Sequence, residues 1–232
     1  MGYGVELSRA STGPARRKSA TNARTGTRGR VDRSEILRAA FELFAREGDD
    51  GFSLRKLGMS VGVDPMTVLH HFRSREELLR EIADHALATV AQPLPTEDWR
   101  FDLKAIARAY RDLARKHPRV FRLHFRFHAT GPIDHASSEV VYRAMRRAGL
   151  PDEEAAGMGL AYYAFVLGFA VSEAEGLLRP IDCDVEAELS ALDPLGYPAT
   201  RALIPAFKSL DPDAAFDASI DAFIEGVAQR TA

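Results

Sequence analysis

The chain has 232 residues, of which 46% are hydrophobic and 28% charged, so it is long enough for one or two domains with a sizeable core. These fractions exclude a disordered chain, a collagen and a low-complexity polymer, and the single cysteine, Cys183, excludes an intramolecular disulfide framework and is typical of a reducing cytoplasm. The net charge of −2 conceals a charge of +5 over residues 1–80 and −7 over residues 81–232, which indicates a short N-terminal part that meets a polyanion.

Residues 1–30 are basic and show no apolar periodicity. Seven Lys and Arg residues stand against one acid, Glu6, and Ser, Thr, Gly and Ala fill most of the remainder. This composition predicts a flexible basic arm.

The first helical pattern begins at Asp32. Apolar side chains recur at the three- and four-residue spacing of one helix face, with Asp32 placed as the N-cap and Gly48 as the stop. The apolar positions are Ile36, Leu37, Ala40, Phe41 and Phe44.

Two short helical segments follow, Ser53 to Val61 and Pro65 to His71. Gly62 suits the positive φ of a tight turn between them, and Asp64 caps the second segment ahead of Pro65. Two helices of about two turns joined through such a turn predict a helix-turn-helix. Val68 and Phe72 face the core, which leaves an outward set of Pro65, Met66, Thr67, Leu69, His70 and His71.

A longer helix is expected over residues 75–91, because Ser74-Arg-Glu-Glu77 has the sequence of a capping box. Pro93 and Pro95 end it and mark a domain boundary. We therefore expect a helix-turn-helix domain over 31–92 and a second helical domain over 93–232. The remaining predicted helices cover 101–116, 118–129, 134–148, 151–177, 199–209 and 213–229, with a loop over 179–198. No stretch alternates with period two, so the fold class is all-α.

Within the helix at 151–177, the uncharged run 155–172 has the length of a membrane span. It contains three glycines and has acidic residues on both sides. We therefore expect a buried helix of a soluble, cytoplasmic protein with no membrane partner.

The helix-turn-helix carries the functional prediction. A helix of this kind fits the major groove of double-stranded DNA and presents its first residues to base edges. Its positive N-terminal dipole, with Arg55, Lys56, Arg73 and Arg75 nearby, suits flanking phosphates. Any corner between two helices has similar spacing, but the basic arm and the charge asymmetry favour DNA binding.

The order and spacing of these motifs resemble the DNA-binding domain of the tetracycline repressor (TetR) family. The matching residues are FELFAREG at 41–48, GFSLRKL at 51–57, Gly62-Val63, Thr67, His71-Phe72 and SREELL at 74–79, with a weaker match of FDASIDAFIEG at 216–226 to the last helix of that family. The resemblance implies a homodimeric, ligand-responsive regulator, usually a repressor, that binds a palindromic operator.

The resemblance also assigns roles to residues. It places Ser53 and Arg75 on the DNA backbone, Arg55 on base or backbone, and the first turn of the recognition helix, residues 64–67, on the bases. Leu69 stands where the family usually has a tyrosine whose hydroxyl binds a phosphate. Leucine cannot make this hydrogen bond, so either His70 or His71 replaces it or the contact is absent.

In the second domain, aromatic side chains with polar tips suggest a pocket for a mostly apolar effector, although such a set also suits an ordinary core. The ligand-binding candidates are His124, Phe125, His128, Tyr142, Tyr162 and Phe165. The small and apolar faces of helices 151–177 and 213–229 predict the homodimer contact.

Two alternatives remain open at this stage. A metal-dependent enzyme would use the cluster His117, His124, His128 and His135, but the sequence HFRFH lacks the glutamate of the H-E-x-x-H signature. An architectural DNA-binding module would respond to no small molecule. We expect no cofactor, no bound metal and no catalysis.

Overall fold

The computed structural model describes residues 31–127 and 129–231; the predicted basic arm (1–30) and His128 lie outside the described residues. The described part of the chain is helical and contains no strand, which confirms the all-α prediction. Its helices are α1 (Arg33–Gly51), α2 (Leu54–Val61), α3 (Pro65–Phe72), α4 (Arg75–Leu87), α5 (Trp99–Lys116), α6 (Pro118–Phe121), α7 (Leu123–Arg126), α8 (Pro132–Arg147), α9 (Asp152–Ala174), α10 (Cys183–Ser190), α11 (Pro198–Ala202), α12 (Ile204–Lys208) and α13 (Pro212–Arg230).

The ends of α1 are set by local sequence, as predicted. The Asp32 carboxylate accepts a hydrogen bond from the Glu35 N–H at 2.8 Å, and the Glu35 carboxylate accepts one from the Asp32 N–H at 3.2 Å. This reciprocal pair satisfies two free N–H groups of the first turn. At the other end, Gly48 adopts φ +71°, so regular helix stops there and only a short turn continues to Gly51.

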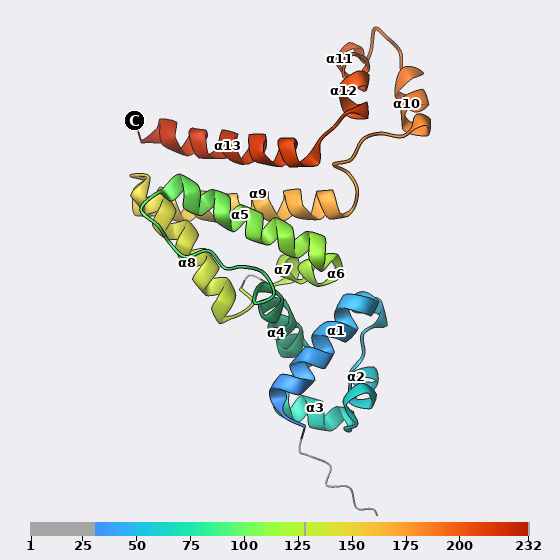
Figure 1. The fold of residues 1–232 in the computed structure, drawn as a ribbon, viewed down its shortest axis with the longest axis vertical. Helices are drawn as coiled ribbons and strands as arrows, with labels where there is room; N and C mark the ends of the chain where they lie inside the picture. The colour runs from blue at the N-terminus through green and yellow to red at the C-terminus, as the bar shows by residue number, and fades with distance from the viewer. Residues whose placement is uncertain (1–30, 128, 232) are drawn as a thin grey trace, which may run out of the picture. The chain divides into compact units, whose positions relative to one another are not determined.

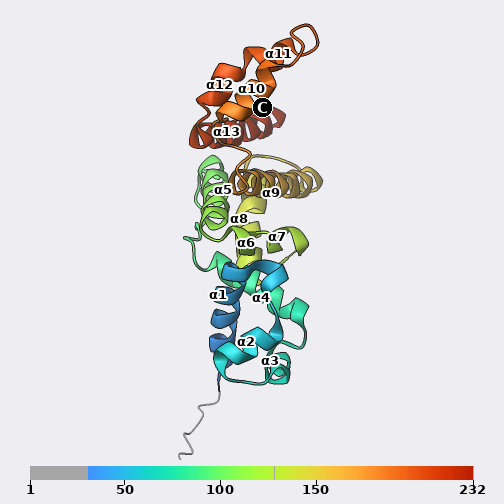
Figure 2. The ribbon, with the colours of Figure 1, turned by 90° about the vertical axis from the view of Figure 1, so that its right-hand side faces the viewer.

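The helix α4 joins the two halves of the chain and is one turn shorter than predicted. Its last carbonyls are taken by side chains that follow it: Thr89 Oγ1 donates to Ala86 at 2.7 Å and Gln92 Nε2 donates to Leu87 at 2.6 Å. These bonds close the helix at Leu87, whereas the prediction relied on the more distant prolines. Figures 1 and 2 show α4 between the α1–α3 group and α8, and it packs against α1, α3, α5 and α8.

The core of the second half is built from α5, α8 and α9, which pack against one another (Figure 1). The apolar helix α9 is, within residues 31–127 and 129–231, the one helix long and apolar enough to cross a membrane by length and composition. One of its faces is buried against α5 and α8, but only 33% of its most apolar stretch is buried, so the helix is not buried all round as the sequence analysis expects. The buried residues of this face are Ala155, Gly159, Tyr162, Val166, Leu167 and Ala170.

Three predicted segments differ from the structure. Where one helix was predicted over 118–129, the described residues form two single turns, α6 and α7. The regular helical pattern is interrupted at Arg122, whose carbonyl accepts from the Phe125 N–H, three residues on. The segment 199–209 is divided into α11 and α12, where Pro205 lacks a donor. Residues 183–190, predicted as loop, form α10, because Asp182 caps its first turn by accepting from the N–H groups of Asp184 and Val185.

Candidate DNA-binding surface and ligand cavity

The turn between α2 and α3 has the geometry that its sequence predicts. Ser53 caps α2 by accepting from the Lys56 N–H at 3.2 Å, and Asp64 caps α3 by accepting from the Met66 N–H at 2.8 Å. Between them, Gly62 ends α2 at φ +72°, and the Val63 N–H donates to the Gly58 carbonyl at 2.9 Å. These local bonds fix the crossing of two short helices and confirm the helix-turn-helix.

The inner faces of the two helices are anchored in the core. Leu57 of α2 and Val68 and Phe72 of α3 are fully buried with α1 and α4. Gly58 is also buried, and a Cβ added there would lie 2.7 Å from the Val63 carbonyl oxygen. The turn therefore packs directly on the backbone of α2, which holds α3 at a fixed angle.

The outer face of α3 is open to solvent. Met66 is 68% exposed, Thr67 and His70 are exposed, and Pro65, Leu69 and His71 are half-buried. The exposed side chains at the start of α3 belong to the turn that reads bases in a helix-turn-helix. His70, rather than Leu69, presents a hydrogen-bonding group beyond that turn.

The cations around the helix-turn-helix fall into two groups. Lys56 pairs with Glu47 at 2.6 Å, and Arg75 pairs with Asp49 at 2.6 Å. Arg55 and Arg73 are exposed and form no ion pair with any described residue. Arg55 and Arg73 are therefore available to bind a phosphate. Lys56 and Arg75 can bind a phosphate only by giving up their ion pairs with Glu47 and Asp49.

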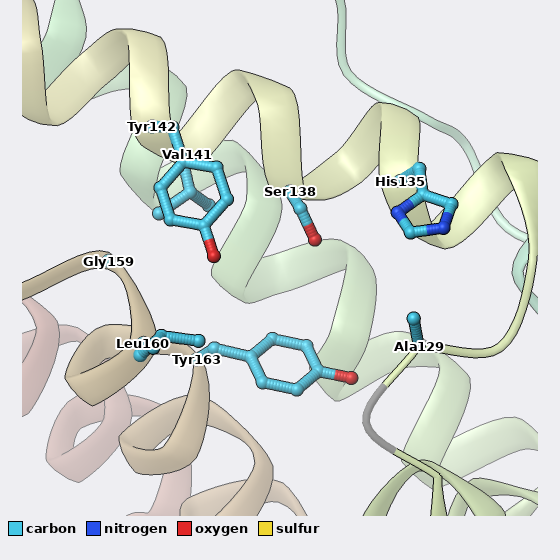
Figure 3. Close-up of a pocket in the computed structure, with 8 residues that line it drawn as sticks. All are labelled: Ala129, His135, Ser138, Val141, Tyr142, Gly159, Leu160 and Tyr163. Atoms are coloured by element: carbon cyan, nitrogen blue, oxygen red, sulfur yellow. The ribbon is translucent and has the colours of Figure 1, made fainter. Parts of the chain in front are cut away.

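A cavity of about 270 Å³ lies between α8 and α9 (Figure 3). Tyr142, Ser138 and His135 project into it from α8, and Tyr163 projects from α9 with its hydroxyl directed toward Ala129. The full lining is Ala129, His135, Ser138, Val141, Tyr142, Gly159, Leu160 and Tyr163. The cavity thus combines apolar walls with hydroxyl and imidazole groups, as small-molecule sites do.

Of the six predicted ligand-binding residues, Tyr142 lines this cavity. Tyr162 is buried beside it, but its hydroxyl donates to the Leu103 carbonyl at 2.7 Å, which directs it into the core toward α5. Phe165 stacks on Phe223 at 5.9 Å, on the α13 side of α9. Phe125 is 53% exposed, and His128 lies outside the described residues.

His124 is buried and packs against the rings of Tyr110 and Phe121. Neither of its ring nitrogens has a hydrogen-bond partner among the described residues. Burial lowers the pKa of His124 to about 4, so the imidazole is neutral at physiological pH. It contacts Tyr110, whose ring in turn meets Tyr163 edge-on at 5.5 Å, which connects it to the cavity wall.

Both halves of the chain match models of known protein families. Residues 36–82 match the model of the bacterial regulatory proteins of the tetR family, and residues 92–231, more than half of the chain, match the model of the tetracyclin repressor-like C-terminal domain. The chain belongs to the tetracycline repressor family. As a member of that family it is a DNA-binding transcriptional regulator.

Individual relatives agree with this assignment. The tetracycline repressor of class A from transposon 1721 of Escherichia coli is 29% identical over 198 residues, which span 84% of this chain and 89% of the relative. The repressor DrrR1 of Streptomyces coeruleorubidus is 27% identical over 140 residues, 60% of this chain and 52% of that protein. Among solved structures, ligand-free ActR of Streptomyces coelicolor superposes with a TM-score of 0.75 at 25% identity, covering 86% of this chain and 95% of ActR.

The three histidines of the predicted cluster that are among the described residues, His117, His124 and His135, have different surroundings. Among the described residues, no three His, Cys, Asp or Glu side chains lie close enough to hold a metal ion. His117 packs on the ring of Phe41 at 4.9 Å, His124 is enclosed by rings, and His135 lines the cavity. The relatives of this tetracycline repressor family member are transcription factors, so the comparisons support neither an enzyme nor an architectural module.

Arg33 is a positioning residue that the sequence analysis missed. Its Nε donates to the His71 carbonyl at 3.2 Å, near the end of the recognition helix, its guanidinium lies 4.6 Å from the Phe72 ring centroid, and it pairs with Glu81 of α4. It therefore ties α1, α3 and α4 together. In the sequence Arg33 is visible only as a basic residue directly after the Asp32 cap, and this position does not reveal which residues it contacts.

Proposed function

We propose that this family member binds a palindromic operator as a homodimer in the cytoplasm and is released from it by a small, mostly apolar effector. The observation that carries the proposal is the open first turn of α3, held at a fixed angle by buried Leu57, Val68 and Phe72. We assign DNA binding to residues 31–92, effector binding and dimerisation to 93–232, and added phosphate contacts to the basic arm at 1–30. The proposed DNA contacts are Ser53, Arg55, Lys56, Asp64, Pro65, Met66, Thr67, His70, His71, Arg73 and Arg75.

The proposed dimer contact uses the outward faces of α9 and α13. A Cβ added at Gly157 or Gly168 on α9, or at Gly226 on α13, would meet nothing within 4 Å, so a second helix can approach closely there. A two-fold dimer places two recognition helices about 34–36 Å apart, or a multiple of this distance, which requires an inverted repeat in the DNA.

The DNA directly upstream of the protein's own gene is the first fragment to test. We expect the protein to protect an inverted repeat there, with two protomers bound per repeat in sedimentation experiments and weak binding of a single half-site. A monomer at micromolar concentration that binds half-sites and full sites equally well would refute the dimeric model.

Two substitutions separate phosphate contact from base contact. We expect Arg55→Ala to weaken binding to all sequences and to reduce the slope of log K against log salt by about 0.9, the contribution of one phosphate. Met66→Ala is expected to leave the slope unchanged and to alter base preference by about 1–3 kcal/mol, because its side chain stands at the start of α3. Operator titrations at four salt concentrations measure both effects.

The matched control for these variants is Arg143→Ala on α8. Arg143 is exposed and forms no ion pair with any described residue, as is true of Arg55, but it lies in the second domain. It should change neither affinity nor slope. Equal losses in Arg55→Ala and Arg143→Ala would show a general charge effect instead of a contact.

The cavity between α8 and α9 is the proposed effector site. Solved structures of ActR, which has the same fold, were obtained with (S)-DNPA and with actinorhodin, and this supports a small-molecule role for the second domain here. The route to DNA runs through α4, which begins beside α3 and packs against α8. An effector that favours a displaced α4 lowers operator affinity, and by linkage the operator lowers effector affinity by the same factor.

A further inference from the structure

We propose that the effector is an uncharged aromatic molecule with a hydroxyl group, and that this hydroxyl binds Tyr163 at the end of the cavity backed by Thr130 and Asp134. The inference rests on the proposed function, because it names the chemistry of the same cavity. Three features support it. The cavity lining contains no Lys, Arg, Asp or Glu, buried polar atoms behind the lining lack hydrogen-bond partners, and the carboxylate of Asp134 lies beside them.

The lining contains no fixed charge. Its eight residues include three hydroxyls, on Ser138, Tyr142 and Tyr163, and one imidazole, on His135, but no Lys, Arg, Asp or Glu. A charged ligand in such a cavity loses its hydration without gaining an opposite charge. Neutral groups that donate and accept hydrogen bonds match these side chains better.

The cavity walls suit a flat ring. The rings of Tyr142 and Tyr163 project into the space from α8 and α9, respectively (Figure 3). Tyr142 lies directly on Gly159, where an added Cβ would come within 2.8 Å of two ring carbons. Glycine therefore lets this ring lie against α9, so the rings of Tyr142 and Tyr163 both line the cavity and offer an aromatic ligand apolar contact.

Several buried polar atoms around Tyr163 have no hydrogen-bond partner. The Tyr163 hydroxyl and Thr130 Oγ1 are buried and have no partner among the described residues, and neither have the nitrogens of His124. Tyr110 contacts both the Tyr163 ring and the His124 ring. A buried polar atom without a partner is costly, so a ligand group that bonds to the Tyr163 hydroxyl gains more than it would at a satisfied site.

The carboxylate charge of Asp134, behind this end of the cavity, disfavours an anionic ligand. The Asp134 carboxylate is only 3% exposed and accepts from the Tyr110 hydroxyl at 2.7 Å and the Thr130 N–H at 3.1 Å. Burial and the charge of Asp134 raise the pKa of Tyr163, against a smaller lowering by the nearby Tyr110 hydroxyl, so the Tyr163 hydroxyl stays protonated and can donate. A ligand carboxylate would face this negative charge, whereas a ligand hydroxyl can accept from Tyr163.

Three naphthalene probes that differ only in their polar group test the inference. At pH 7, 2-naphthol is neutral, 2-naphthoate is an anion and 2-naphthylmethylamine is a cation. We expect calorimetry on the full chain to show 2-naphthol binding at least about tenfold more tightly than either charged probe. Tighter binding of the anion or the cation overturns the inference, and so does the absence of binding by all three.

Neighbouring tyrosines supply a variant and its matched control. Tyr163→Phe should weaken 2-naphthol about tenfold, because the ring stays and the donor is lost. Tyr162→Phe should leave probe affinity unchanged, because its hydroxyl bonds to the Leu103 carbonyl instead of facing the cavity. Unchanged binding in Tyr163→Phe overturns the placement of the hydroxyl. Asp134→Asn, which removes the charge at constant shape, should narrow the preference for 2-naphthol over 2-naphthoate.

Operator titrations on the same samples separate this inference from the proposed function. If 2-naphthol binds selectively and operator affinity stays the same, the chemistry of the cavity is supported and release by an effector is not. If the operator binds and none of the probes does, DNA binding stands and the chemistry inferred here is wrong.

Discussion

Glu173→Gln is expected to lower the free energy of unfolding by about 1.5–3 kcal/mol, the usual loss for a hydrogen bond to a charged group, because the exposed Asp213 carboxylate, 2.9 Å away, is then the remaining counter-charge of buried Arg111. The side chains of Arg111 and Glu173 are 7% and 9% exposed, and Arg111 Nε lies 2.6 Å from Glu173 Oε2. Arg111 also donates to the Pro212 carbonyl at 2.8 Å and covers the ring of Phe216 at 4.3 Å. The pair therefore holds α5, α9 and the start of α13 together, and glutamine would turn an N–H group toward the guanidinium.

Glu175→Gln is the control two residues away. Glu175 pairs with Arg122, but these side chains are 48% and 60% exposed, and such surface pairs contribute about 0–1 kcal/mol. Urea unfolding of both variants measures the difference, which corresponds to a lower Tm of roughly 3–12 °C for Glu173→Gln. Similar losses in the two variants would show that burial of Arg111 does not determine the effect.

The same pair predicts an acid dependence. Burial raises the pKa of Glu173, but hydrogen bonds from Arg111 and Arg115 outweigh it and hold the pKa below the ordinary value of 4.5. Because the folded pKa is depressed, the stabilisation is present above pH 4.5 and is lost as the pH falls through the folded pKa. The stability difference between wild type and Glu173→Gln should therefore shrink on acidification.

The helix-turn-helix was predictable because its determinants are local. Asp32, Ser53, Asp64 and Ser74 each cap the helix that follows directly, and Gly62 marks the turn. The helix α10 was missed although Asp182 caps it in the same way, because residues 179–198 were predicted as a loop. The end of α4 depended on Gln92 reaching back to Leu87, which no periodicity reveals.

The cavity was less predictable because it depends on which way a helix is turned. Tyr162 and Tyr163 are adjacent in sequence, yet one bonds to Leu103 in the core and the other lines the cavity. Consecutive residues on a helix point about 100° apart, and the packing of α9 on α5 and α8 decides which faces inward. The sequence correctly predicted that aromatic residues with polar tips line the cavity, but only the packing of the helices identifies Tyr163 instead of Tyr162 as the lining residue.

Asp84→Ala is expected to uncouple α4 from α8 and to lower stability by about 0.5–2 kcal/mol, the usual loss for a missing cap. The helix α8 has no side-chain cap of its own. Instead, Asp84 Oδ1 on α4 accepts from the N–H groups of Ile133 and Asp134, both at 3.0 Å. Gly131 permits this approach, because a Cβ there would lie 2.5 Å from Asp84 Cγ. One carboxylate thus ties the helix that follows the recognition helix to the helix that carries His135, Ser138 and Tyr142.

Asp84→Asn separates the bonds from the charge. Burial raises the pKa of Asp84 in spite of the two backbone hydrogen bonds. The ionised carboxylate therefore lowers the free energy of unfolding, and protonation of Asp84 as the pH falls removes this destabilisation. Asparagine keeps the accepting oxygen without the charge, and we expect its stability to equal or exceed that of wild type at neutral pH.

Amide hydrogen exchange with and without operator DNA tests the coupling and requires no effector. In wild type and Asp84→Asn, operator binding at α3 and the start of α4 should increase protection of the Ile133 and Asp134 amides. In Asp84→Ala these amides should exchange faster and respond little to DNA, while the amides of α3 become protected as in wild type. An equal response of the α8 amides in Asp84→Ala would mean that the two halves communicate through other contacts, such as the Asp49 pairs with Arg75 and Arg126.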